Sequence, residues 1–142
     1  MAAASPGGAP SAEPDWAEVH AAAAHDRALA ARRAFDMLRS GLGYPDVLTQ
    51  VFRAFNAEGR TRVTVADAAE VLARYGGLLA RQGVLDAART ALEASIAIDP
   101  DRYDARLGAG TVTFMQADLA AAEAHYAAAS ALRSGEVEPM AA

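Results

Sequence analysis

Cysteine and lysine are both absent from this chain of 142 residues, and aromatic residues make up only 6% of it. Without cysteine, the chain forms no disulfide and offers no thiolate as a nucleophile or metal ligand. Much of the 53% apolar fraction is alanine, which is the best helix former but buries little area per residue. The core must therefore be thin and depend on close helix contact, which favours an all-helical bundle or solenoid.

Positive charge is also scarce, because the net charge is −5 and every basic residue is an arginine. Arg32 and Arg33 are the only adjacent basic pair, and no basic stripe is interleaved with aromatic residues, so we expect no nucleic-acid partner. No apolar run of about 18 residues is present to span a bilayer. The first 14 residues lack the charged and apolar regions of a secretory signal. We therefore expect a cytoplasmic protein without stable membrane insertion.

The two ends of the chain have the composition of unstructured segments. Residues 1–14 are rich in Ala, Pro, Gly and Ser, which predicts a disordered tail, and residues 135–142 are expected to form a flexible tail. Between them, residues 15–59 are predicted to form two helices that resemble no repeat. They are either a capping hairpin or a degenerate repeat.

Local signals give the boundaries of these helices. Asp15 and Glu18 are spaced as a capping box for the first helix, which is expected to run to about Gly41. Pro45 suits the first turn of the second helix, which Gly59 is expected to close. A further capping box is predicted where Thr64 is followed by Asp67, at the start of a third helix.

Residues 64–134 contain an internal repeat with a period of 34 residues. When the segment after Ala69 is shifted by one period, identical or similar residues coincide. The pairs are Gly76 with Gly110, Gln82 with Gln116, Leu85 with Leu119, Ala87 with Ala121, Ala88 with Ala122, Leu92 with Tyr126 and Ile98 with Leu132. The small residues are expected where neighbouring helix axes cross, since larger side chains would separate them.

The two copies, residues 69–102 and 103–136, resemble the tetratricopeptide repeat (TPR), a helix–turn–helix unit of this length. The second copy departs from the pattern, with Arg106 in place of a large aromatic residue, Ala117 in place of the turn glycine and Ser134 in place of the closing proline. The resemblance implies an all-α, TPR-like superhelix of about two repeats, preceded by the two non-repeat helices.

In such an architecture, the first helices of successive repeats line a concave groove. The positions carried over from the family that we expect to contact a partner are Arg74, Arg81, Leu107, Thr111, Phe114 and Met115. A small apolar groove of this kind suits an extended or helical segment with aliphatic anchors. Equally, Phe114 and Met115 are suited to packing against a following helix or a second subunit.

Residues that could carry chemistry do not form a recognisable site. His20 and His25 are five apart and lie on different sides of a helix, while His125 is distant in sequence, so no metal is expected. The stretch from Asp99 to Asp104 lacks the glycine and glutamate of a calcium loop; we expect it to be a turn in which Asp101 caps the next helix. No enzyme or cofactor is therefore expected, unless His20 and His125 converge with acidic residues in a pocket.

A narrower resemblance lies in the segment YDARLGAG, from Tyr103 to Gly110. It is similar to the repeat opening of bacterial type III secretion chaperones for hydrophobic translocators, which are small, acidic, helical proteins built from tetratricopeptide units. The resemblance implies a protein-binding module that shields an apolar client segment. The alternative is a structural or oligomerising scaffold, possible as a homodimer, that self-associates through the open ends of its repeats.

Overall fold

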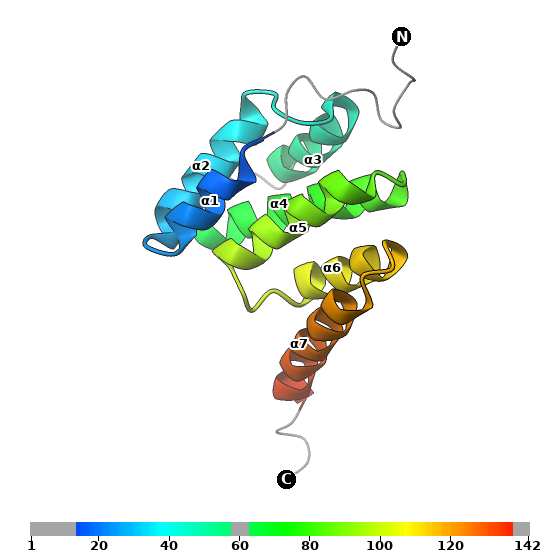
Figure 1. The fold of residues 1–142 in the computed structure, drawn as a ribbon. Helices are drawn as coiled ribbons and strands as arrows, with labels where there is room; N and C mark the ends of the chain where they lie inside the picture. Colours follow the sequence, from blue (N-terminus) through cyan, green and yellow to red (C-terminus); the bar gives the residue numbers. More distant parts are fainter. Residues whose placement is uncertain (1–13, 58–62, 138–142) are drawn as a thin grey trace.

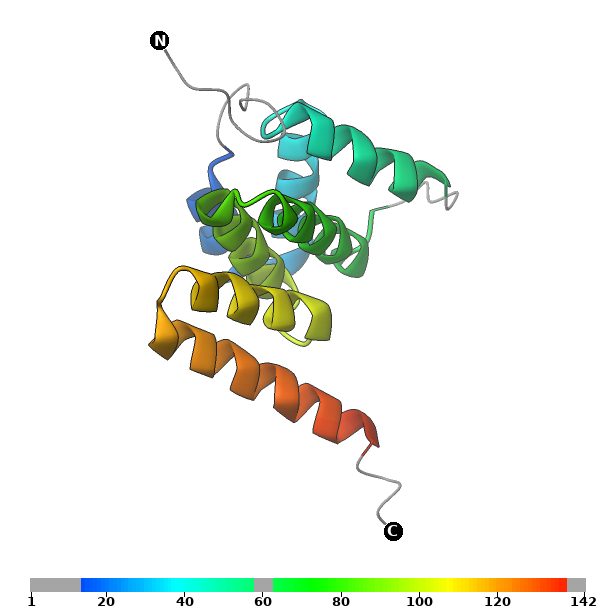
Figure 2. The same cartoon turned by 90° about the vertical axis from the view of Figure 1, so that its right-hand side faces the viewer.

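The computed structural model describes residues 14–57 and 63–137. These residues form helices and no strands, which confirms the all-α class. The helices are α1 (Trp16–Ala23), α2 (Arg27–Arg39), α3 (Pro45–Ala57), α4 (Val65–Arg81), α5 (Leu85–Ile98), α6 (Tyr103–Met115) and α7 (Leu119–Val137). Figures 1 and 2 show α3 at one end of the molecule, α7 at the other, and the α4–α5 pair between them.

The prediction of one continuous helix from Asp15 to about Gly41 is wrong. The chain turns after α1 and returns as α2, which packs against it. Asp26 ends the turn and caps α2, since its carboxylate accepts hydrogen bonds from the backbone N–H groups of Ala28 and Leu29 at 3.0 and 3.2 Å. The expected cap at Asp15 makes no side-chain hydrogen bond. The alanine-rich periodicity predicts one helix here, but the cap at Asp26 ends the first helix and starts a second.

The start of α3 at Pro45 and the capping box at α4 are confirmed. Thr64 accepts a hydrogen bond from the backbone N–H of Asp67 at 3.0 Å, and the Asp67 carboxylate accepts one from the backbone N–H of Thr64 at 3.2 Å. The predicted stop at Gly59 lies outside the described residues, as do residues 1–13 and 138–142 of the two predicted tails. Helix α7 extends to Val137, three residues beyond Ser134.

Helix α4 is the centre of the core, because it contacts α2, α3, α5 and α6. Leu72 and Leu79 of α4 and Leu92 of α5 are at most 1% exposed. The one buried serine of this interface is satisfied, since the Ser95 hydroxyl donates a hydrogen bond to the Ala69 carbonyl oxygen at 2.7 Å. Helices α1 and α2 also pack against the α4–α5 pair: α1 contacts α5, and α2 contacts both helices (Figure 1).

The α4–α5 and α6–α7 hairpins turn in the same way, one period apart. The backbone takes a positive φ at Gly83 (81°) and at Ala117 (63°), which is 34 residues later. In the first turn the N–H of Val84 bonds the Leu79 carbonyl at 3.0 Å; in the second, the N–H of Asp118 bonds the equivalent Thr113 carbonyl at 2.9 Å. The sequence repeat is thus also a repeat of local structure. How far the hairpins continue as a superhelix stays a prediction.

In each hairpin, a glycine of the first helix packs directly against a large side chain of the second helix. A Cβ on Gly76 would lie 2.6 Å from Cγ of Leu92, and a Cβ on Gly110 would lie 2.8 Å from Cδ1 of Tyr126. Both distances are too short for a real contact, so only glycine permits this approach. These two pairs are the ones that the 34-residue shift aligns.

The turn between the hairpins differs from the prediction at Asp101. Helix α6 begins after Arg102, and no side chain caps its N-terminus. Instead, the Arg102 guanidinium binds the Asp104 carboxylate within the first turn at 2.8 and 2.9 Å. A salt bridge has replaced the expected cap.

Ala117 is the one described residue other than glycine with a positive φ, which leads to a stability prediction. Left-handed backbone costs an L-residue about 1–2 kcal/mol, and glycine avoids most of that cost. We expect Ala117→Gly to raise the free energy of unfolding by about 1 kcal/mol in urea denaturation. Gly83→Ala is the matched control and should lower it by a similar amount. Unchanged midpoints in both variants would show that the positive φ at these turns does not carry this cost.

Candidate functional site

Two neighbouring hollows follow the outer side of α4, and we call them together the α4 groove. The first, of about 280 Å³, lies between α3 and α4 and is lined by Val51, Arg74, Gly77, Leu78 and Arg81. The second, of about 490 Å³, lies between α4 and α6 above α5. Its lining residues are Gly77, Ala80, Arg81, Leu92, Leu107, Gly108, Thr111, Val112 and Met115. Gly77 and Arg81 belong to both hollows, so the groove continues across α4.

Five of the six residues predicted to contact a partner line this groove. Arg81, Leu107, Thr111 and Met115 lie together in the second hollow, and Arg74 lies with Arg81 in the first. Phe114 is the exception, because it lines a separate hollow formed with α7. The structure therefore brings α4 and α6 together as the repeat requires but turns one predicted residue away from the groove.

Small residues create the space in the groove, and apolar residues form its walls. Gly77 has no atom within 4 Å of where a Cβ would be, while a Cβ on Gly108 would meet Leu92 at 3.3 Å. Leu107 and Met115 project from α6 and are 39% and 55% exposed. Because the two glycines carry no side chain, the groove is deeper at these positions. The aliphatic side chains beside it remain available for contact.

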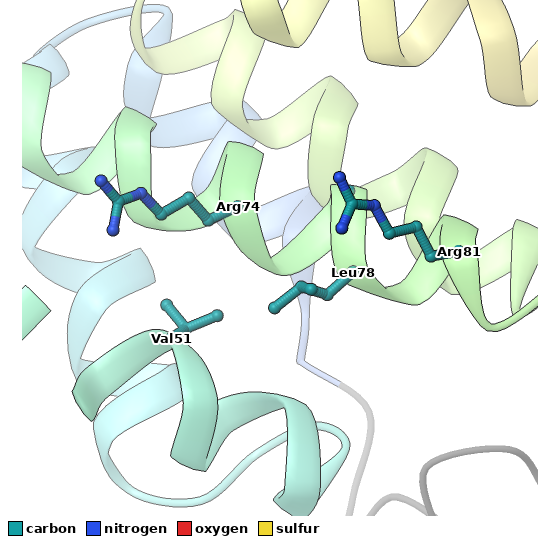
Figure 3. A pocket seen from close by; sticks show the side chains of 5 residues that line it. Val51, Arg74, Leu78 and Arg81 are labelled. Carbon is teal, nitrogen blue, oxygen red and sulfur yellow. The ribbon is translucent and has the colours of Figure 1, made fainter. Parts of the chain in front are cut away.

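Two arginines of α4 give the groove a local positive charge in an acidic chain. Arg74 is held by an ion pair with Glu70 at 2.6 Å. Arg81 is exposed and makes no hydrogen bond or ion pair with any described residue. Figure 3 shows both side chains extending from α4, with Val51 and Leu78 in the space between α3 and α4. A carboxylate entering the groove would find a partner in Arg81.

Phe114 belongs to a second apolar surface, which we call the end face. It consists of Phe114, Leu119, Ala122, Glu123, Tyr126 and Ala127 around a hollow of about 650 Å³ on α6 and α7. Phe114 and Leu119 are 59% and 61% exposed. The face lies at the α7 end of the molecule, away from α3 (Figure 2). Phe114 was expected in the groove because it falls at one of the repeat positions carried over from the family.

A further hollow contains the two histidines whose convergence with acidic residues would indicate an enzyme. His20, Glu93 and His125 line it, with Ile96 and Ala97. Burial, and then the positive charge of Arg106, lower the pKa of His125. The hollow offers no serine or threonine hydroxyl, and Glu93 is already bound by the Nε of Arg89 at 3.0 Å.

The convergence that the sequence analysis set as the condition for an enzyme is present, because His20, His125 and the acidic Glu93 line one hollow. In residues 14–57 and 63–137, no group of three or more histidine or acidic residues is placed to hold a metal ion. His25 lies apart from the hollow, exposed at the turn between α1 and α2. The two imidazoles share a hollow, but no nucleophile accompanies them.

No family model, characterised protein or solved structure matches the chain. Within the described ranges, no helix has the length and apolar character needed to cross a membrane. Functional inference therefore rests on the groove, the end face and the histidine hollow. The groove combines open space and apolar walls with an available positive charge.

Proposed function

We propose that the chain is a non-enzymatic, TPR-like interaction module that binds a segment of a partner protein in the α4 groove. The observation that carries the proposal is the hollow of about 490 Å³ between α4 and α6, walled by Leu107 and Met115 and bordered by Arg81. It joins an apolar surface with one available cation, which is the composition of a peptide-binding surface.

Apolar contact supplies most of the affinity in this proposal. An aliphatic side chain of the partner would seat against Leu92, Leu107 and Met115, and removing each such anchor from water contributes about 1.5–3 kcal/mol. An acidic residue of the partner beside Arg81 would fix the register of the segment. Charge pairs at the edge of an interface add specificity and association rate more than affinity.

A secretion chaperone is the narrower form of the proposal. It rests on the resemblance of the segment from Tyr103 to Gly110 to translocator chaperones, and this segment carries two of the groove residues, Leu107 and Gly108. In that role, the groove would shield an apolar client segment from water and from other apolar surfaces. Identifying the bound protein then distinguishes a secretion chaperone from a general interaction module.

We test the groove with a photo-crosslinking amino acid at Thr111, which is exposed at its edge. In extract from the native cell, we expect one dominant crosslinked protein, identified by mass spectrometry. Adding Leu107→Asp should reduce crosslinking about 10-fold or more, because a charge would have to be buried beside the anchor. The same probe at Gln50, exposed on α3, should not capture that protein.

Val63→Asp is the matched control, since Val63 is 38% exposed and Leu107 is 39% exposed, but Val63 lines neither hollow of the groove. It should leave the crosslink unchanged. Circular dichroism would confirm that each variant keeps its helicity. Equal crosslinking with and without Leu107→Asp would dismiss the groove as the binding site.

The second candidate function is a scaffold that self-associates as a homodimer through the end face. It draws on the exposure of Phe114 and Leu119. Glu123 opposes it, because a symmetric contact would bury this carboxylate against a second end face that carries no basic residue in its lining. A molecular mass that does not change with concentration would argue against self-association.

A further inference from the structure

The end face has a counterpart within the same molecule. Shifted back by one period, its apolar residues Phe114, Leu119 and Tyr126 fall on Ala80, Leu85 and Leu92 of the first hairpin. Unlike the end face, that earlier surface is largely covered by α6, which packs on α5, so that Leu92 is buried and Ala80 and Leu85 are half-buried. Leu92 is 1% exposed as a result, whereas the equivalent Tyr126 is 37% exposed.

The α5–α6 contact shows what kind of structure fits this type of surface. Helix α6 approaches through Gly108, where a Cβ would lie 3.3 Å from Leu92. A small residue at this point lets the helix lie close to the second helix of the preceding hairpin. By the same geometry, the end face is suited to a helix that carries glycine or alanine at the point of closest approach.

Charge distinguishes the two surfaces. In the first hairpin, Arg89 binds the covering hairpin, with its Nη2 3.0 Å from an Asp118 carboxylate oxygen and its Nη1 donating to Oε1 of Gln116 at 3.1 Å. One period later, the position of Arg89 is held by Glu123. The end face therefore presents a negative charge where the first hairpin presents a positive one, so its occupant needs a basic residue in place of Asp118.

A second copy of the chain does not supply this chemistry. A two-fold contact would pair two end faces that are each lined by Glu123 and by no basic residue, so neither carboxylate would gain a partner. A head-to-tail contact would need an apolar surface at the other end, but α3 exposes polar residues such as Asp46, Gln50 and Arg53. Among the described residues, the only large exposed apolar side chain outside α6 and α7 is Val63.

We propose that the end face binds a helix of a different protein, one that carries glycine or alanine at the closest approach and arginine or lysine in the turn after the helix, ten residues later, as Asp118 follows Gly108. The helix takes the place on the α6–α7 hairpin that α6 takes on the α4–α5 hairpin. The inference is independent of the α4 groove, because the two surfaces share no lining residue.

The test uses a peptide of residues 101–118, because this segment covers the equivalent surface of the first hairpin. A side-chain lactam on the solvent face holds only Tyr103–Met115 helical, which leaves the last three residues free to form the turn. One version keeps Asp118 and the other carries Asp118→Arg. We expect the arginine version to bind the full chain about 10-fold tighter in fluorescence anisotropy, since it faces Glu123. In the protein, Glu123→Arg should reverse the preference between the two peptides.

Two further variants locate the binding. Phe114→Glu combined with Leu119→Glu should lower the affinity for the arginine peptide about 10-fold or more, because it places charge on the end face. Val63→Glu, an equally nonconservative change elsewhere, should leave the affinity unchanged. Circular dichroism checks that all variants keep their helicity.

Three results would overturn the inference. The first is failure of the arginine peptide to bind, and the second is equal affinity for both peptides. The third is a compact dimer with a dissociation constant below about 1 μM in sedimentation equilibrium, which would identify a second copy as the occupant. Peptide binding that follows the charge of residue 123, in a protein that sediments as a monomer, supports it.

Discussion

Replacing Leu92 by alanine is expected to lower the free energy of unfolding by about 2–5 kcal/mol, the range for large-to-small changes in a packed core. Leu92 is 1% exposed and lies between two glycines, Gly76 of α4 and Gly108 of α6. Its side chain therefore fills the junction of both hairpins. Urea denaturation followed by circular dichroism measures the loss.

A second substitution tests whether the Gly76–Leu92 contact is as close as the structure indicates. Gly76→Ala alone should destabilise the protein by about 1–3 kcal/mol, because its Cβ meets Leu92, although alanine favours a helix by about 1 kcal/mol. In the Leu92→Ala protein that obstacle is gone. The loss of stability in the double variant should therefore differ from the sum of the two single losses by about 0.5–3 kcal/mol. Simple additivity would mean that the two residues do not touch.

Gly43→Ala is expected to destabilise the protein by about 3 kcal/mol. Gly43 has a φ of 125°, which costs an alanine about 1–3 kcal/mol. Its new Cβ would also collide with the Tyr75 hydroxyl oxygen, which accepts a hydrogen bond from the buried backbone N–H of Tyr44 at 3.0 Å. Leaving that N–H without a partner costs about 1–3 kcal/mol more.

The effect should be concentrated in α3, because the Tyr44–Tyr75 hydrogen bond joins the start of that helix to α4. Hydrogen exchange should accelerate in Pro45–Ala57 before it does in α5. Gly41→Ala is the matched control: its φ is also positive (93°), but no atom lies within 4 Å of the new Cβ, so only about 1 kcal/mol should be lost. Equal losses at the two glycines would show that the Tyr75 contact is unimportant.

The sequence predicts the repeated half of the molecule better than the first half because its signals there are local and occur twice. The glycine-to-large-residue pairs Gly76–Leu92 and Gly110–Tyr126 fall where the 34-residue shift aligns them. The Thr64 capping box needs only three residues of spacing. By contrast, the turn at Asp26 stands in an alanine-rich stretch where helical periodicity continues across it.

The groove could be predicted in part, for the same reason. Positions carried over from one repeat to the next place Leu107 and Met115 on the side of α6 that faces α4. Phe114 precedes Met115 by one residue, which is about 100° around a helix, and that rotation directs it to the end face instead. Small errors of phase matter most at the last turn of a helix.

The surfaces formed by residues distant in sequence could not be predicted. His20 of α1 and His125 of α7 share a hollow beside α5, on which α1 packs, and no periodic signal in the sequence connects α1 with α7. The end face likewise becomes recognisable only when its counterpart under α6 is compared with it. Both depend on tertiary packing that has no local signature.

A crosslink between the α4–α5 and α6–α7 hairpins tests whether they are equivalent units stacked in register. Gln116, in the second turn, donates a hydrogen bond to the Asp86 carboxylate of α5 at 2.7 Å. Since the chain has no cysteine, Asp86→Cys with Gln116→Cys gives a unique pair for a short bifunctional thiol reagent. We expect rapid crosslinking within one chain, with little for Asp86→Cys paired with Ser130→Cys. Equal crosslinking of both pairs, or none of the first, would contradict the stacked arrangement.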